Sequence, residues 1–96
     1  MTNKSKPSIT EIILQTIADI DSIHSSDLLM PGTSFNTLGF DSLDFVEMLM
    51  LIEDSMGKPL DYAVCLLDKL AEINKDYTVL TIADVISTVK EIEDEV

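Results

Sequence analysis

The sequence predicts an all-α protein in which four helices surround one core. Its 96 residues suffice for one domain. Hydrophobic residues make up 46% of the chain, enough for a packed core, but aromatic residues only 5%, with no Trp. The core must therefore be built from aliphatic side chains and Met. Four segments repeat apolar residues at helical spacing, and turn-forming residues separate them, which is typical of a bundle.

The first helix is predicted over residues 8–21. Ser8 and Glu11 have the spacing of a capping box, in which each side chain bonds to the other residue's backbone. The apolar residues that follow recur at intervals of four, four and three, on one face: Ile9, Ile13, Ile17 and Ile20. Residues 1–7 form a polar lead that is predicted to be disordered, with no readable signal peptide or membrane span.

Residues 22–40 are predicted to form a long first loop, because Ser25-Ser26, Pro31-Gly32 and Gly39 all favour turns. A connection of this length is uncommon in a compact domain unless it is functional or held by its own side chains. We expect its apolar residues to anchor it to the core: Leu28, Leu29, Met30, Phe35 and Leu38.

The second and third helices are separated by Gly57 and Pro59. The second is predicted to begin at Asp41 or Ser42 and to reach about residue 56, because Gly57 is a typical C-terminal stop. The third is predicted over residues 62–73, with Asp61 as its cap.

The fourth helix is predicted over residues 82–93, and residues 94–96 form a tail. Thr81 and Asp84 resemble a second capping box at its start. Its apolar face consists of Ile82, Val85, Ile86 and Val89. The single cysteine, Cys65, lies in an apolar run of the third helix, so we predict a buried thiol rather than a reactive one.

The second helix carries two apolar stripes. At 100° per residue, one stripe lies within about 60° of Phe45 and forms an ordinary core face: Phe45, Met48, Leu49, Ile52 and Met56. The other lies on the far side and is edged by carboxylates: Leu43, Val46 and Met50, with Glu47, Glu53 and Asp54. Two interpretations remain open, a helix buried on both sides or an exposed docking ridge for basic partners.

The chain is strongly acidic, with 18 Asp and Glu against 6 Lys and no Arg, a net charge of −12. This charge repels nucleic acid and anionic membranes and attracts basic protein surfaces, although solubility alone also explains it. We expect a cytoplasmic monomer that neither binds nucleic acid nor inserts into a membrane.

Six consecutive residues, Leu38-Gly39-Phe40-Asp41-Ser42-Leu43, resemble the phosphopantetheine attachment motif of acyl and peptidyl carrier proteins, Leu-Gly-x-Asp-Ser-Leu. Upstream, Thr33-Ser34-Phe35 is similar to the family's lead into the motif. Downstream, the acidic second helix and Leu80–Val85 are similar to its recognition helix and last helix. The resemblance covers about residues 8–93, the expected carrier domain.

The resemblance implies that Ser42 carries a covalent 4′-phosphopantetheine arm. A separate carrier-protein synthase, a phosphopantetheinyl transferase, attaches the arm as a phosphodiester, using coenzyme A and a divalent metal. The thiol of the arm then holds acyl groups as thioesters for acyl-transferring and condensing enzymes. The carrier itself performs no chemistry.

The resemblance also implies two further groups of residues. The partners are expected to recognise the start and outer face of the second helix: Asp41, Leu43, Asp44, Val46, Glu47, Met50, Glu53 and Asp54. The acyl chain is expected to enter a cavity, unless a solid core fills the space, among Leu49, Ile52, Met56, Leu66, Leu67 and Leu70.

Only Asn36 and Thr37 separate Phe35 from Leu38, which is closer to carriers of polyketide and peptide assembly lines than to the fatty-acid type. We therefore expect a freestanding carrier of fatty-acid, polyketide or peptide biosynthesis, and the spacing favours the polyketide or peptide type over the fatty-acid type. The alternative is an acidic helical adaptor or inhibitor that needs no modification. The sequence does not favour catalysis or a metal site, because His24 is the only His and no aspartate spacing fits a calcium loop.

Overall fold

The computed structural model describes residues 8–21, 30–59 and 61–94. These residues form α1 (Ile9–Asp21), α2 (Phe35–Leu38), α3 (Ser42–Ser55), α4 (Tyr62–Ile73), the 3₁₀ helix η2 (Tyr77–Val79) and α5 (Ile82–Asp94). Over the described ranges the chain contains no β-strand, only an isolated bridge between Ser34 and Thr81. The all-α fold class is confirmed, and the four long helices match the predicted segments closely.

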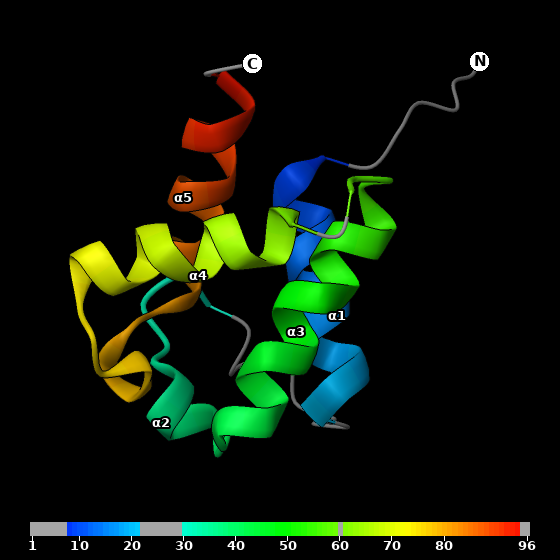
Figure 1. The fold of residues 1–96 in the computed structure, drawn as a ribbon. Helices are drawn as coiled ribbons and strands as arrows, with labels where there is room; N and C mark the ends of the chain where they lie inside the picture. The colour runs from blue at the N-terminus through cyan, green and yellow to red at the C-terminus, as the bar shows by residue number, and fades with distance from the viewer. Residues whose placement is uncertain (1–7, 22–29, 60, 95–96) are drawn as a thin grey trace.

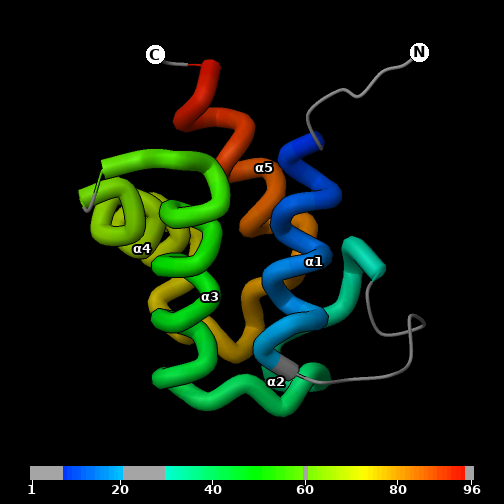
Figure 2. The backbone as a smooth tube through the Cα atoms, turned by 90° about the vertical axis from the view of Figure 1, so that its right-hand side faces the viewer, coloured from blue at the N-terminus to red at the C-terminus, as the bar shows by residue number. Residues whose placement is uncertain are grey.

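Three long helices run along one direction and the fourth crosses them. Figure 1 shows α1 and α3 side by side and antiparallel, with α5 to their left, and α4 lying across the front of α5 towards α3. In Figure 2, turned by 90°, α4 is seen almost end-on beside α3. Helix α1 packs on α3 and α5, and α4 packs on the same two helices. The start of α3 lies beside α2, at the opposite end from the last turn of α5.

The predicted capping boxes start α1 and α5. The Ser8 N–H donates to Glu11 Oε1 at 2.8 Å, and the Glu11 N–H donates to Ser8 Oγ at 3.1 Å. At α5, the Thr81 N–H donates to Asp84 Oδ2 at 2.9 Å and the Asp84 N–H to Thr81 Oγ1 at 3.2 Å. Each box satisfies backbone donors that the helix itself leaves unpaired. Residues 1–7, the first part of the predicted loop (residues 22–29, which includes the expected anchors Leu28 and Leu29), Leu60 and the last two residues of the tail lie outside the described ranges.

The predicted first loop contains a helical turn, α2, that was not predicted from the sequence. Ser34 accepts a hydrogen bond from the Thr37 N–H at the start of α2, and Gly39 ends it with a φ of +77°, a conformation that favours glycine. Phe35 and Leu38 are buried, as predicted, whereas the prediction for Met30 is wrong because its side chain is 57% exposed. Backbone hydrogen bonds hold the segment around Met30 instead, including the bond from the Ala83 N–H to the Pro31 carbonyl at 2.9 Å.

Two predictions about α4 are wrong. Asp61 occupies the N-cap position but its side chain makes no capping hydrogen bond. The carboxylate of Glu53 on α3 accepts the Ala63 N–H instead, at 3.0 Å. Cys65 is exposed, because α4 buries only the face that contains Tyr62, Leu66 and Leu70 at intervals of four residues.

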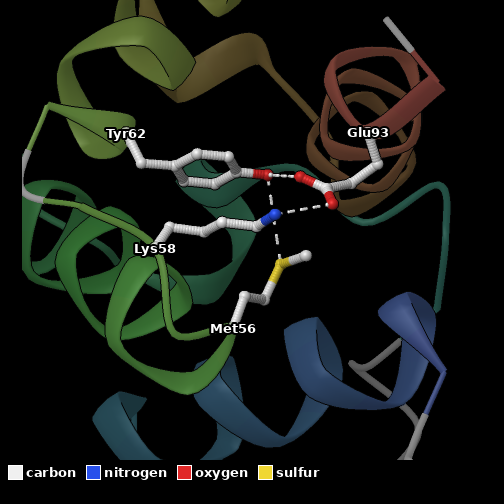
Figure 3. A network of polar contacts seen from close by, with 4 residues as sticks. All are labelled: Met56, Lys58, Tyr62 and Glu93. Atoms are coloured by element: carbon white, nitrogen blue, oxygen red, sulfur yellow. Dashed lines mark hydrogen bonds and ion pairs between the residues drawn. The ribbon is translucent and has the colours of Figure 1, made fainter. Parts of the chain in front are cut away.

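A polar network joins the end of α5 to the connection between α3 and α4 (Figure 3). The Lys58 ammonium lies 2.9 Å from Glu93 Oε1, and the Tyr62 hydroxyl donates to Glu93 Oε2, also at 2.9 Å. The bond to Lys58 lowers the pKa of Glu93, and partial burial together with the bond to Glu93 raises the pKa of Tyr62. None of the described helices has the length and apolar composition needed to cross a membrane.

Candidate functional site

Ser42 is the first residue of α3 and is exposed, but it does not cap the helix. Asp41 is the cap: its Oδ1 accepts the Asp44 N–H at 2.8 Å, and Asp44 Oδ2 accepts the Asp41 N–H at 3.2 Å. A serine at a helix start usually serves as the cap itself. Because Asp41 takes that role, the Ser42 hydroxyl has no hydrogen-bond partner among the described residues. It is free to react.

The backbone around Ser42 suits a phosphate group. The first intrahelical bond of α3 runs from the Phe45 N–H to the Asp41 carbonyl, and the Asp44 N–H is used by the capping box. The N–H groups of Ser42 and Leu43 have no acceptor in the part of the chain that the structure describes. These donors and the positive end of the helix dipole favour a phosphodiester on Ser42 Oγ.

A cluster of aromatic side chains supports the turn before Ser42. The Phe35 ring lies 5.3 Å from the Phe40 ring and 5.2 Å from the Phe45 ring, between centroids, and Phe45 lies 5.0 Å from Tyr77. The Tyr77 hydroxyl also donates to the Phe40 carbonyl at 3.4 Å. Phe40 is therefore a core residue, which accounts for the bulky side chain before Asp41. The role of Tyr77 was not predicted, because nothing in the local sequence of residues 75–78 indicates this contact.

The second apolar stripe of α3 is exposed, so the interpretation of a helix buried on both sides is wrong. Leu43 is 76% exposed, Val46 42% and Met50 54%. Glu47 and Asp54 are exposed beside them, and neither forms an ion pair within the described ranges. We call these five residues the acidic ridge; together with Leu51 and Glu53 they line a shallow hollow along the outer face of α3.

Glu53 was predicted to belong to the exposed face, and this prediction is wrong. It is only 6% exposed, because its carboxylate turns towards the start of α4 and accepts the Ala63 N–H. Asp41 and Asp44, also predicted as recognition residues, lie beside Ser42 with their carboxylates engaged in the capping box. Asp41 is exposed and Asp44 partly so.

The structure does not bring the six predicted cavity residues together around one cavity. Four of them are at most 2% exposed and belong to the core, whereas the Leu67 side chain is 42% exposed on the outer face of α4. Met56 borders a separate hollow beside the first turn of α1 and Lys58. The four core residues are Leu49, Ile52, Leu66 and Leu70.

A family model described as the phosphopantetheine attachment site matches residues 11–64. The match covers more than half of the chain, from the first turn of α1 to the first turn of α4. The chain belongs to this family.

Phosphopantetheine-binding domains carry covalent 4′-phosphopantetheine and act as carriers rather than enzymes, and this protein is accordingly a carrier protein. Carrier proteins interact with a phosphopantetheinyl transferase and with biosynthetic enzymes. No curated protein sequence and no solved structure matches the chain. Among the described residues of the carrier, no group of three or more His, Cys, Asp or Glu side chains is placed to hold a metal ion.

Proposed function

We propose that Ser42 Oγ is the atom to which the phosphopantetheine arm is attached. The observation that carries this proposal is the capping of α3 by Asp41, which leaves the Ser42 hydroxyl exposed and without a partner. Two unpaired backbone N–H groups beside it support the charge of a phosphodiester. The aromatic cluster beneath the turn keeps this geometry fixed for an enzyme that must approach from solvent.

The attachment reaction needs a separate transferase. Ser42 Oγ attacks the phosphorus of coenzyme A that bears the pantetheine, and a new O–P bond forms. The pyrophosphate bond of coenzyme A breaks, adenosine 3′,5′-bisphosphate leaves, and a base of the transferase takes the hydroxyl proton. When attached, the arm supplies a thiol that holds acyl groups as thioesters.

The acidic ridge is proposed as the surface that partner enzymes recognise. Its three apolar side chains are exposed in a row, and its two carboxylates lack ion pairs among the described residues, which supports contact with a basic rim around an apolar surface. Asp41 and Asp44, at the same end of α3 as Ser42, extend the acidic surface towards the reacting hydroxyl.

The pathway is proposed to be of the polyketide or peptide assembly-line type rather than the fatty-acid type. The spacing supports this proposal, because only two residues separate Phe35 from Leu38, which is closer to carriers of those assembly lines than to the fatty-acid type. In the structure, Phe35–Leu38 form the single turn of α2, which Gly39 closes. Loading tests with malonyl and aminoacyl groups distinguish the two assembly-line types from each other.

Thioester loading tests the carrier function. A transferase given acetyl-coenzyme A should place an acetyl-phosphopantetheine group on the parent chain, and neutral hydroxylamine should remove the acetyl group while the arm remains. Ser42→Ala should gain neither the phosphopantetheine arm nor the acetyl group. An acetyl group on the parent that resists hydroxylamine would show that it is not held as a thioester on the arm, against the proposal.

A further inference from the structure

A further hollow lies between α3 and α4, and Ser42 is not among the residues that line it. Helix α4 lies beside α3 in both views of the fold (Figures 1 and 2). The hollow has a volume of about 240 Å³ and is lined almost entirely by aliphatic side chains. Its lining residues come from both helices: Val46, Leu49, Met50 and Glu53 from α3, and Ala63, Val64 and Leu67 from α4.

The walls of this hollow are aliphatic where a solvent-facing helix surface is ordinarily polar. On α4, neither Val64 nor Leu67 belongs to the buried face of the helix, and their side chains are 59% and 42% exposed. Val46 and Met50 face them from α3 with similar exposure. A contiguous apolar hollow of this kind marks an interaction site more often than isolated exposed side chains do.

Unpaired carboxylates border the hollow on both sides. Asp61 and Asp68 lie three and four residues from Val64, on the same outer face of α4, and both are exposed. On α3, Glu47 follows Val46 in the chain and Asp54 lies four residues after Met50, and both are exposed. None of these four carboxylates forms an ion pair within the described ranges.

The neighbouring lysines and Glu53 do not change this charge pattern. Lys58 pairs with Glu93 and Lys69 with Glu91, so both lysines are directed to α5. Glu53 is the one charged residue that lines the hollow, and its carboxylate is held by the Ala63 N–H at the positive end of α4. The hollow is therefore apolar inside and negative at its rim.

We propose that this hollow is a socket for one apolar side chain of a partner protein, a side chain of about the size of Leu or Met that is bracketed by Lys or Arg. The inference rests on the proposed carrier function, because it concerns how enzymes that act on the arm are held. The apolar side chain supplies affinity in a desolvated pocket, and the basic residues meet the carboxylates of both helices. Helix α4 thus forms the second wall of a surface that α3 alone leaves open.

Two matched peptides test the socket on the full, unmodified chain. Each is a stabilised helix of about 15 residues with lysines one turn before and after a central position, which is Leu in one peptide and Ser in the other. Titration followed by methyl NMR should show the Leu peptide binding at least about tenfold more tightly, because only it buries an aliphatic side chain. The largest shifts should fall on Val46, Leu49, Val64 and Leu67.

Val64→Asp should abolish the preference for Leu by placing a charge in the wall. The first turn of α4 tolerates an acidic residue, so this variant should remain folded, which its thermal unfolding checks. Val79→Asp, at a residue of similar exposure on η2, should retain the preference. Equal affinity of the two peptides, shifts confined to other surfaces, or an unchanged preference in Val64→Asp would overturn the proposal.

The attachment of the arm is measured separately. Ser42→Ala should bind the Leu peptide as the parent does, because the socket does not include Ser42. Peptide binding without arm attachment to the parent would contradict the proposed function alone, and arm attachment without the Leu preference would contradict the socket alone.

Discussion

The carboxylate of Glu53, near the end of α3, accepts a hydrogen bond from the backbone N–H of Ala63, near the start of α4, at 3.0 Å. Asp61 stands at the N-cap position of α4 without making a capping bond, so Glu53 satisfies one of the unpaired N–H groups of that helix from outside it. The bond also places a negative charge at the positive end of the α4 dipole. It explains how an acidic residue comes to be only 6% exposed.

Replacing Glu53 should therefore destabilise the fold. Glu53→Ala is expected to lower the free energy of unfolding by about 1–2 kcal/mol, the usual cost of losing a capping acceptor. Glu53→Gln keeps an acceptor oxygen and should cost less. Asp54→Ala, at the exposed neighbour, should stay within about 0.5 kcal/mol of the parent. Urea denaturation measures all three, and equal stability of Glu53→Ala and Asp54→Ala would contradict this role.

Charge reversal on the acidic ridge should slow attachment of the arm without unfolding the protein. Glu47→Lys or Asp54→Lys is expected to reduce the rate of modification by a phosphopantetheinyl transferase, and the difference should shrink at high salt. Asp19→Lys, which makes the same change of charge on α1, should have little effect. Equal rates for the ridge variants and the parent would argue that the ridge serves solubility only.

The contribution of Glu93 to stability should depend on pH. Its folded-state pKa lies below the ordinary value of 4.5 because Lys58 bonds to the ionised carboxylate. The ionised group therefore stabilises the folded state above pH 4.5, and this stabilisation is lost as the pH falls through the folded-state pKa.

Glu93→Gln should accordingly be less stable than the parent at neutral pH, by at most about 1 kcal/mol for a partly exposed pair, and the difference should vanish in acid. Glu91→Gln is the control, because its ion pair with Lys69 is longer, at 3.8 Å, and the Glu91 side chain is 64% exposed. Thermal unfolding from pH 7 to pH 3 gives the comparison. A stability difference that is constant with pH would contradict the assigned pair.

Added salt should stabilise the carrier. With a net charge of −12 and no Arg, repulsion between carboxylates disfavours the compact state at neutral pH. Sodium chloride or a divalent cation should raise the melting temperature by screening this repulsion. The double variant Glu47→Lys with Asp54→Lys should respond less. A melting temperature that does not change with ionic strength would refute the prediction.

The sequence predicted the features that depend on neighbouring residues. The capping boxes of α1 and α5 each join residues three positions apart, so their spacing is visible in the chain. The two stripes of α3 follow from helical geometry, although only packing decides that the second stripe is exposed.

Features that depend on distant residues were missed. In the sequence, nothing distinguishes Glu53 from the other acidic residues of α3. Its role as an acceptor depends on the packing of α4 beside it. Cys65 lies in an apolar run, but the orientation of α4 turns it outwards. Tyr77 supports the Ser42 turn across more than thirty residues of sequence, through the Phe40 carbonyl. The position of Ser42 at the start of the helix was predictable. The sequence did not decide whether Ser42 or Asp41 caps the helix, and in the structure Asp41 does.

Intact mass after incubation with coenzyme A, a divalent metal and a phosphopantetheinyl transferase decides whether Ser42 carries the arm. The parent should gain the mass of one phosphopantetheine group and Ser42→Ala none. Ser55→Ala, at the exposed last residue of α3, should gain one group as the parent does. A phosphopantetheine group on Ser42→Ala would contradict the assignment of Ser42, as would an unmodified parent when the same transferase preparation modifies another carrier protein.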